Sequence, residues 1–342
     1  NEDNVSSADE GRGVAIQDRF VESNSYEGRI NISAAYLMGE LALTDKLKTI
    51  LGVRVEQYAQ YYTGLNQEAL SGGPAGRVFD DEKVLDSFDF FPSVNLIYSV
   101  FENSNIRASF SQTVARPSFK ELSTAEIQDV LTGRTFLGNI DLVPTYINNF
   151  DLRWEFFFKR GQTVSLGGFY KTFKDPIELV RQPLQPTDIK PTNVGDAEII
   201  GIEFESRKNL DFISPAFSNF SITTNFTWTS AIVKIDSTER EGRMRGLRDG
   251  QTLETERDFV GQPPFIINAS LNYTDFEKGW DAGLSFNRQG ATLAVVGINR
   301  VADTYTVPFN SLNLNISKSF GNNDKNKLSV RVTNILGVFR DR

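Results

Sequence analysis

The 342-residue chain contains no cysteine and no histidine. Without cysteine there is no disulfide framework and no thiolate to bind a metal or attack a substrate. Without histidine there is no imidazole to act as a general base or as a metal ligand. We therefore expect no catalytic site, no metal site and no cofactor, because the best candidate residues of most enzymes are missing.

The chain also lacks an excess of positive charge and lacks long apolar runs. Its 36 Lys and Arg residues against 44 Asp and Glu residues give a net charge of −8. Affinity for nucleic acid comes largely from basic side chains that neutralise phosphates, so we expect no nucleic-acid partner. No run of about 18 apolar residues is present to form a membrane-spanning helix. A membrane-spanning barrel stays possible, because its lipid-facing and lumen-facing residues alternate.

What the chain does have is alternation with a period of two. In the segment from Asp151 to Tyr170, apolar and polar residues alternate up to a tight turn at Lys159 to Gly161, after which the same rhythm resumes. Such a pattern predicts a hairpin of strands with one apolar and one polar face. One face carries Leu152, Trp154, Phe156 and Phe158, and the other carries Asp151, Arg153, Glu155 and Lys159.

The same rhythm recurs along the chain and predicts an all-β fold. Many of the predicted strands are long enough to match the roughly 9 to 11 tilted residues that cross a bilayer. The fold class is therefore a transmembrane antiparallel β-barrel. The twelve predicted strands span residues 30–43, 47–62, 87–101, 104–115, 146–159, 162–174, 196–208, 218–234, 263–275, 279–292, 305–318 and 327–338.

Short and long connections alternate strictly between these strands. Short turns at one end and long loops at the other are typical of outer-membrane barrels, in which the turns are periplasmic and the loops extracellular. Aromatic clusters near strand ends favour the same interpretation, since such rings prefer the lipid headgroup level. Aromatics lining a soluble β-core are the alternative, which leaves the asymmetry of the loops unexplained. The long connections span residues 63–86, 116–145, 175–195, 235–262 and 293–304.

The direction of the strands predicts that the chain is part of a larger barrel. If the short turns are periplasmic, both chain ends lie outside the cell, whereas single-chain bacterial barrels normally have periplasmic termini and an even number of strands. Residues 1–13 are polar and acidic, as in a loop, and do not form a secretory signal. We expect residues 1–342 to be the C-terminal portion of one barrel domain, with no separate soluble domain. A complete twelve-stranded barrel with inverted termini is the alternative.

Three segments resemble TonB-dependent outer-membrane receptors in order and spacing. They are "SFSQTVARPSFKEL" from Ser109 to Leu122, "GNIDLVPTYINNFDLRWEFFF" from Gly138 to Phe158, and "LSVRVTNILGVFR" from Leu328 to Arg340. Thr145 and Tyr146 depart from the glutamates that the family commonly has after the proline. The resemblance implies that the twelve strands are the tenth to the twenty-first of a 22-stranded barrel.

The resemblance also implies a function. Such receptors actively import a nutrient, such as an iron chelate, cobalamin, a glycan or a peptide, which the extracellular loops bind. Outer-membrane lipid surrounds the barrel, and an N-terminal plug fills it. A TonB box ahead of the plug engages the inner-membrane TonB complex, and neither part is among these residues. A surface lipoprotein is a further partner that the resemblance allows.

Two sets of charged residues are candidates for contact with a ligand or a plug. The first set has lumen parity or lies at a strand end, and cross-strand ion pairs on a solvated wall are its alternative interpretation. The second set lies in the mixed-charge loop 235–262, where arginines can hold an anion through bidentate contacts or simply keep a surface solvated. The first set is Arg54, Glu56, Arg153, Glu155 and Arg116, which precedes Pro117, and the second is Arg243, Arg245 and Arg248.

Two other classes of protein fit the same strand pattern. A passive porin, or a barrel for export or adhesion, shares the periodicity and the loops but lacks a plug. An outer-membrane hydrolase needs a nucleophile and a base, and the absence of histidine counts against it. A plug with a TonB box upstream of residue 1 would distinguish the importer from both.

Overall fold

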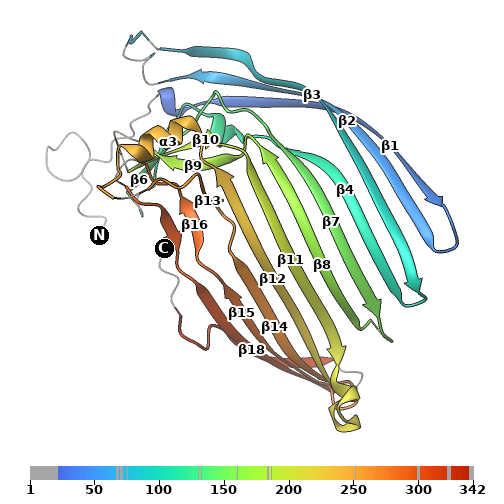
Figure 1. The fold of residues 1–342 in the computed structure, drawn as a ribbon. Helices are drawn as coiled ribbons and strands as arrows, with labels where there is room; N and C mark the ends of the chain where they lie inside the picture. The colour runs from blue at the N-terminus through green and yellow to red at the C-terminus, as the bar shows by residue number, and fades with distance from the viewer. Residues whose placement is uncertain are drawn as a thin grey trace.

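The computed structural model describes residues 22–338, apart from 67–68, 70–71, 75, 130, 132, 160, 183–184, 186, 251, 299–300 and 322–324. In this part, twelve long strands form one curved antiparallel sheet in sequence order, so each strand pairs with the next long strand of the chain (Figure 1). The strands are β1 (Glu27–Ala42), β2 (Leu47–Leu65), β3 (Val78–Phe101), β4 (Ser104–Ala115), β7 (Thr145–Phe157), β8 (Thr163–Lys174), β11 (Ala197–Asn209), β12 (Phe220–Lys234), β14 (Phe265–Asp275), β15 (Trp280–Gln289), β18 (Phe309–Phe320) and β19 (Asn326–Val332).

All twelve predicted strands are confirmed, with errors at some bounds. β3 begins at Val78, well before the predicted residue 87, because its first part extends beyond β4 and pairs only with β2. β19 ends at Val332 rather than at 338, and beyond it Asn334 and Gly337 have φ values of 54° and 63°, outside the β region. β18 begins at Phe309 rather than at 305. The predictions that involve residues 1–13, Arg160 and Arg340 lie outside the described residues.

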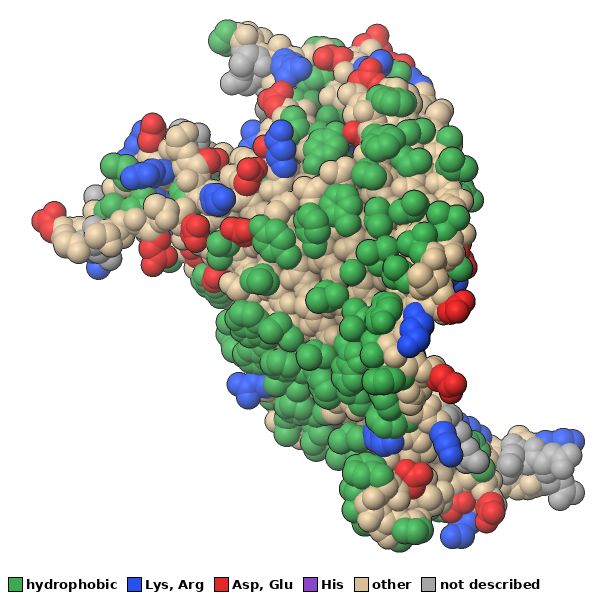
Figure 2. Space-filling view, turned by 45° about the vertical axis from the view of Figure 1, so that its right-hand side comes forward, with side chains coloured by type: hydrophobic (Ala, Val, Ile, Leu, Met, Phe, Trp, Pro, Cys, Tyr) green, Lys and Arg blue, Asp and Glu red, His purple; other side chains and the backbone are tan. Residues whose placement is uncertain are grey.

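The two faces of the sheet differ as the alternation predicts. The outer face carries exposed apolar side chains, such as Leu152 of β7, Ile202 of β11 and Trp228 of β12. Hydrophobic side chains cover the broad middle of the face seen in Figure 2, whereas charged side chains gather toward its ends. The inner face carries the residues of opposite parity, including Arg153 and Glu205, which pair with each other. This is the pattern of a barrel wall with lipid on one side and a polar lumen on the other.

The height of the apolar band matches a bilayer. On the outer face of β7, hydrogen-bonded polar side chains begin at Asn148, and the aromatic row at the other end reaches Phe158, whose ring lies 4.7 Å from that of Phe156. At about 3.3 Å per residue, this stretch is ~33 Å long, or ~25 Å high at a tilt of about 40°. The aromatics of the Asp151 to Tyr170 hairpin therefore lie in the membrane-facing band.

The described parts of the long connections contain short elements of their own. Four of the five predicted loop regions are confirmed, whereas the first is shorter than predicted, because β2 runs to Leu65 and β3 begins at Val78. β5 (Glu126–Asp129), β6 (Arg134–Leu137), β10 (Asp188–Asn193) and β9 (Ile177–Arg181) form a small sheet in that order, and β13 (Glu256–Asp258) pairs with the end of β12. The others are η2 (Glu22–Asn24), α2 (Phe119–Leu122), α3 (Ser237–Met244), β16 (Thr292–Val295) and β17 (Thr304–Thr306), with η3 (Leu210–Phe212) and η4 (Pro215–Phe217) in a turn.

These connections fold onto the inner face at one end of the wall (Figure 1). A buried apolar cluster joins Ala197, Ile199 and Val233 of the wall to Val194 and Phe259 of the connections, and Val180 of β9 packs against it. Burial of such side chains contributes about 1.5–3 kcal/mol each. The connections are thus held inside the curve of the sheet. No helix in the described part of the chain has the length and apolarity that a membrane-spanning helix requires.

Between β3 and β4, the ladder of the described wall ends before either strand does. Their pairing runs from Phe101 and Ser104 to Ser93 and Ser111 and stops there. Beyond it, β3 continues on β2 alone, and β4 continues on β7 up to Ala115. Pro92, which has no N–H to donate, stands directly beside the last pair. We call the gap between residues 78–92 of β3 and residues 112–115 of β4 the seam.

Candidate functional site

The inner wall carries a row of charged side chains that crosses four strands. Arg107 of β4 donates to Glu155 of β7 at 2.7 Å, and Arg153 Nε lies 3.2 Å from the other oxygen of Glu155. Arg153 also pairs with Glu205 of β11, whose second oxygen accepts from Asn225 of β12. The predicted pair Arg153 and Glu155 thus lies on the lumen side and is engaged in cross-strand ion pairs. Because at least one side chain of each pair is a third or more exposed, these pairs contribute at most about 1 kcal/mol each.

Arg116 bridges the seam. It follows β4, yet its guanidinium donates to Glu56 of β2 at 2.9 Å and to Asp89 of β3 at 2.6 Å. It lies 4.3 Å from the ring centroid of Tyr58, and Tyr146 of β7 donates to the other oxygen of Asp89 at 2.7 Å. Side chains therefore hold the two edges together where the backbone ladder is missing.

Burial makes this bridge stronger than the pairs of the inner wall. The side chains of Arg116, Glu56 and Asp89 are 14%, 11% and 5% exposed, whereas Arg107 is 46% exposed. Arg54, another predicted candidate, donates to Glu56 at 2.7 Å and so completes the same cluster. The structure thus brings together three of the predicted residues, Arg54, Glu56 and Arg116, in a structural cluster.

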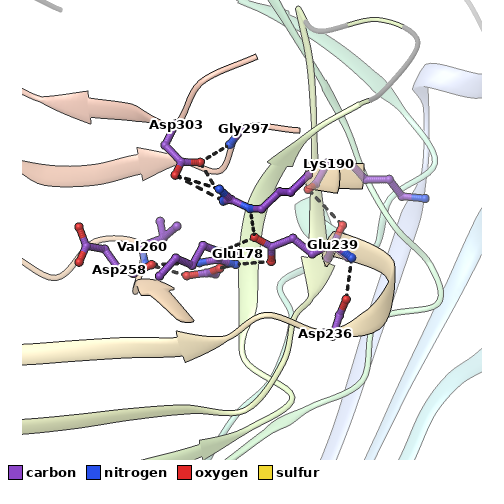
Figure 3. A network of polar contacts seen from close by, with 11 residues as sticks. Glu178, Lys190, Asp236, Glu239, Asp258, Val260, Gly297 and Asp303 are labelled. Carbon is purple, nitrogen blue, oxygen red and sulfur yellow. Dashed lines mark hydrogen bonds and ion pairs between the residues drawn. The ribbon is translucent and has the colours of Figure 1, made fainter. Parts of the chain in front are cut away.

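A second and more deeply buried network holds the long connections to one another (Figure 3). Arg257 of β13 donates to Glu178 of β9 at 2.6 Å and to Glu239 of α3 at 2.7 Å. Glu239 also accepts from Arg243 at 2.8 Å, and Arg243 reaches Asp303 at 3.1 Å. Three connections that lie far apart in the sequence are therefore tied by two arginines. We call these five residues the loop lock.

The backbone supplies the remaining partners of the loop lock. The N–H of Val260 donates to Glu178 at 2.7 Å, and the N–H of Gly297 donates to Asp303 at 2.7 Å. Asp236 caps α3 by accepting from the N–H of Glu239 at 2.8 Å, which orients the helix that carries Glu239 and Arg243. Figure 3 shows Glu178, Glu239 and Asp303 converging from three separate elements.

The electrostatics of the loop lock follow from burial. Burial raises the pKa of Glu178 above its usual value, against the opposing effects of Arg257 and the N–H of Val260. Burial opposes the charge on Arg257 as well, but Glu239 and Glu178 outweigh it and raise the pKa of Arg257. Arg257 therefore stays charged, and Glu178 is the carboxylate whose ionised form burial disfavours.

Arg243 is the one member of the loop lock among the predicted candidates, so sequence reasoning missed Glu178, Glu239, Arg257 and Asp303 as site residues. Glu178 could have been noticed, because it interrupts the apolar residues Ile177, Leu179 and Val180. A carboxylate buried in such a segment needs a buried partner. Asp303 lies in a polar connection and gives no such signal. Of the predicted loop arginines, only Arg243 enters the network, whereas Arg245 and Arg248 are exposed beyond the end of α3.

A pocket of about 470 Å³ lies beside the loop lock. Its lining includes Arg243 and Asp303 together with Glu254, Asp258 and Tyr305. Within the described ranges no group of three or more acidic residues is arranged to hold a metal ion. Most of its lining residues belong to the long connections, and their polar groups suit a ligand with hydrogen-bonding groups.

The phenol of Tyr305, which lines this pocket, has a raised pKa. Burial and the hydrogen bond to Asp258, 2.9 Å long, raise the pKa of Tyr305 from 10.0 to about 12. Because the folded state favours the neutral phenol, the stabilisation that Tyr305 contributes is complete below pH 10 and is lost as the pH rises toward 12. We expect an ultraviolet titration of tyrosinate to lose a late-titrating group in Tyr305→Phe. Loss of a group that titrates at the ordinary pKa would contradict the assignment.

The fold and the two clusters define the wall of a bacterial outer-membrane β-barrel with ordered, inward-folded connections. The family model for the TonB-dependent receptor-like β-barrel matches residues 3–335. The chain belongs to this family, as the resemblance of the three motifs implied. Comparison with curated proteins found no match.

Solved structures of similar fold are themselves transporters and receptors. The copper transporter OprC and the ferric citrate transporter FecA in its unliganded form each have a TM-score of 0.65 and 15% identity, and they are matched over 90% and 91% of this chain. The ferric-catecholate import receptor Fiu from K12 E. coli, in a closed form, has a TM-score of 0.60 and 13% identity over 92% of this chain. The match covers only 42%, 41% and 41% of those three chains, so this chain spans less than half of their length.

Proposed function

We propose that the chain is the C-terminal portion of a TonB-dependent importer that takes up a scarce or bulky nutrient across the outer membrane. The long connections face the outside of the cell and bind the ligand, and the short turns face the periplasm. A plug and a TonB box N-terminal to this part couple the barrel to the inner-membrane TonB complex. The twelve strands make up the last part of a 22-stranded barrel.

The inward-folded connections are the observation that carries this proposal. Val180 and Phe259 pack against the inner face of the wall, and the loop lock joins β9, α3 and the connection before β17. A passive channel works by leaving its lumen open, whereas this arrangement narrows the mouth and builds a polar pocket there. An energy-coupled importer fits the arrangement better than a porin or a barrel for export or adhesion.

The similar solved structures suggest which ligands to test first. By their titles, the similar structures handle copper, ferric citrate and ferric catecholates. Iron chelates therefore come first among the ligands to test, followed by cobalamin, glycans and peptides. A surface lipoprotein that covers the mouth is a further partner that suits such an importer, and the proposed role involves no catalysis.

Growth and uptake in a deletion strain test the proposal. We expect loss of the full-length gene to abolish uptake of one of these nutrients at limiting concentration, and the reintroduced gene to restore it. As a matched pair, Arg257→Leu should weaken binding at the mouth, whereas Arg245→Leu on the same connection should not. Uptake that is unchanged by deletion across the whole panel would refute the proposed role.

A further inference from the structure

A second binding site lies on the outer face, at the end that carries the long connections. A groove of about 470 Å³ is lined by residues of β3, β4, β7, β8, β11 and β12, most of which have outward parity. We call it the outer groove and define it by Tyr146, Asn148, Tyr170, Lys174, Glu198 and Lys234. It is separate from the pocket at the mouth, which has none of these residues in its lining.

The outer face changes character within two residues at the level of this groove. Phe110, Phe150 and Tyr170 form an aromatic row on three neighbouring strands, with successive ring centroids 4.9 Å and 6.2 Å apart. The next outward row is a chain of side-chain hydrogen bonds, from Gln112 to Asn148 at 2.8 Å and from Asn148 to Thr172 at 3.0 Å. Aromatic rings followed by hydrogen-bonding groups mark the level of lipid headgroups.

Two lysines stand above this row. Lys174 ends β8 and Lys234 ends β12, and both flank Asp196, whose carbonyl accepts from the N–H of Lys234 at 3.0 Å. Since β11 separates the two strands, the backbones of the lysines lie ~10 Å apart, close enough for two long, flexible side chains to meet at one anion.

The charges on these lysines are available to a ligand. Within the described part of the chain, neither Lys174 nor Lys234 forms an ion pair, although other lysines of the wall do. Glu198, on the same face, accepts from the O–H of Tyr170 at 2.7 Å instead. The groove therefore offers two lysines that form no ion pair in the described structure, with the exposed Asp196 between them, above hydrogen-bonding amides and an aromatic row.

We propose that the outer groove binds the phosphate-bearing headgroup of a membrane lipid. Lys174 and Lys234 contact the phosphate oxygens, the amides of Gln112 and Asn148 bond the polar groups next to it, and the acyl chains lie along the apolar band below Tyr170. A phosphate suits this place because basic side chains just outside the apolar band attract anionic headgroups. The inference rests on the outer-membrane setting of the family and not on the identity of the imported ligand.

Native mass spectrometry of the full-length receptor in detergent tests the site. The probe is diphosphorylated lipid A, compared with its fully dephosphorylated form. We expect the double variant Lys174→Gln/Lys234→Gln to bind the phosphorylated probe about 30-fold more weakly than the unmodified protein, equivalent to about 2 kcal/mol. The matched control is Lys208→Gln/Lys318→Gln, which removes two lysines that contact aromatic rings near the short-turn end.

Each outcome decides for or against the site. A loss confined to the groove variant and to the phosphorylated probe supports it. Equal binding by the groove variant and the unmodified receptor, or equal binding of the dephosphorylated probe, overturns it. Equal losses in the groove and control variants would show a general effect of surface charge. Complete displacement of the probe by inorganic phosphate would show a site for the free anion, which also overturns the lipid assignment.

Discussion

Replacing Arg257 by leucine is expected to release the long connections from one another and from the inner face of the wall. The side chains of Arg257 and Glu178 are 5% and 1% exposed, so the substitution leaves the buried carboxylate of Glu178 without its cation and leaves Glu239 with Arg243 alone. Loss of one partner of a buried ion pair typically costs about 3–5 kcal/mol. Hydrogen exchange of the full-length receptor should therefore show protection falling by about this amount in residues 177–181 and 256–260, while the wall strands stay protected.

Two further variants separate the network from a general effect of mutation in the loops. Arg245→Leu removes an equal charge from an exposed position beyond α3 and should leave protection unchanged. Arg257→Leu combined with Glu178→Leu removes both buried charges and should recover part of the loss, because the unpaired carboxylate causes much of the cost. If Arg257→Leu exchanges like Arg245→Leu, the loop lock does not hold the connections.

Replacing Arg116 by leucine is expected to open the seam. No backbone ladder joins β3 to β4 beyond Ser93 and Ser111 in the described structure, so the edges there depend on side chains. Arg116→Leu leaves Asp89, which is 5% exposed, with Tyr146 but without its cation, at a cost of about 3 kcal/mol. We expect faster exchange in residues 85–92 and 112–115, with no change at the other end of the same strands.

Arg107→Leu is the matched control for the seam. Arg107 also pairs with a carboxylate across neighbouring strands, but it is 46% exposed and lies where the ladder between β3 and β4 is intact. Its loss should cost no more than about 1 kcal/mol. If hydrogen exchange at the seam is equal in both variants, Arg116 contributes no more than a solvent-exposed ion pair of the wall and does not hold the seam together.

The strands could be predicted from the sequence because each one faces two different solvents. An apolar band against lipid and a polar lumen impose a period of two, and the strict alternation of turns and loops fixes the order of pairing. The start of β3 was predicted wrongly because that part of the strand has no lipid-facing apolar row. Residues 78–86 of β3 lie beyond the apolar band, so "VFDDEKVLD" has no lipid-facing row to reveal it as a strand.

The candidate site could be predicted only in part, for a related reason. The lumen parity of Arg54, Glu56, Arg153 and Glu155 follows from the period, and all four form ion pairs on or beside the inner wall. Arg116 reaches Asp89 only because β3 and β4 separate beyond Ser93 and Ser111. Pro92 lies beside this point, but a proline alone does not predict that two strands separate. The loop lock joins residues 178 and 257 through tertiary packing, which no local pattern encodes.

The most direct test of the account is whether uptake depends on TonB. Cells that make the full-length protein, with and without functional TonB, are given the nutrient that the panel identifies. We expect equal binding at the cell surface in both, and accumulation inside only where TonB functions. Accumulation at the same rate without TonB would refute energy-coupled import and would identify a passive pore.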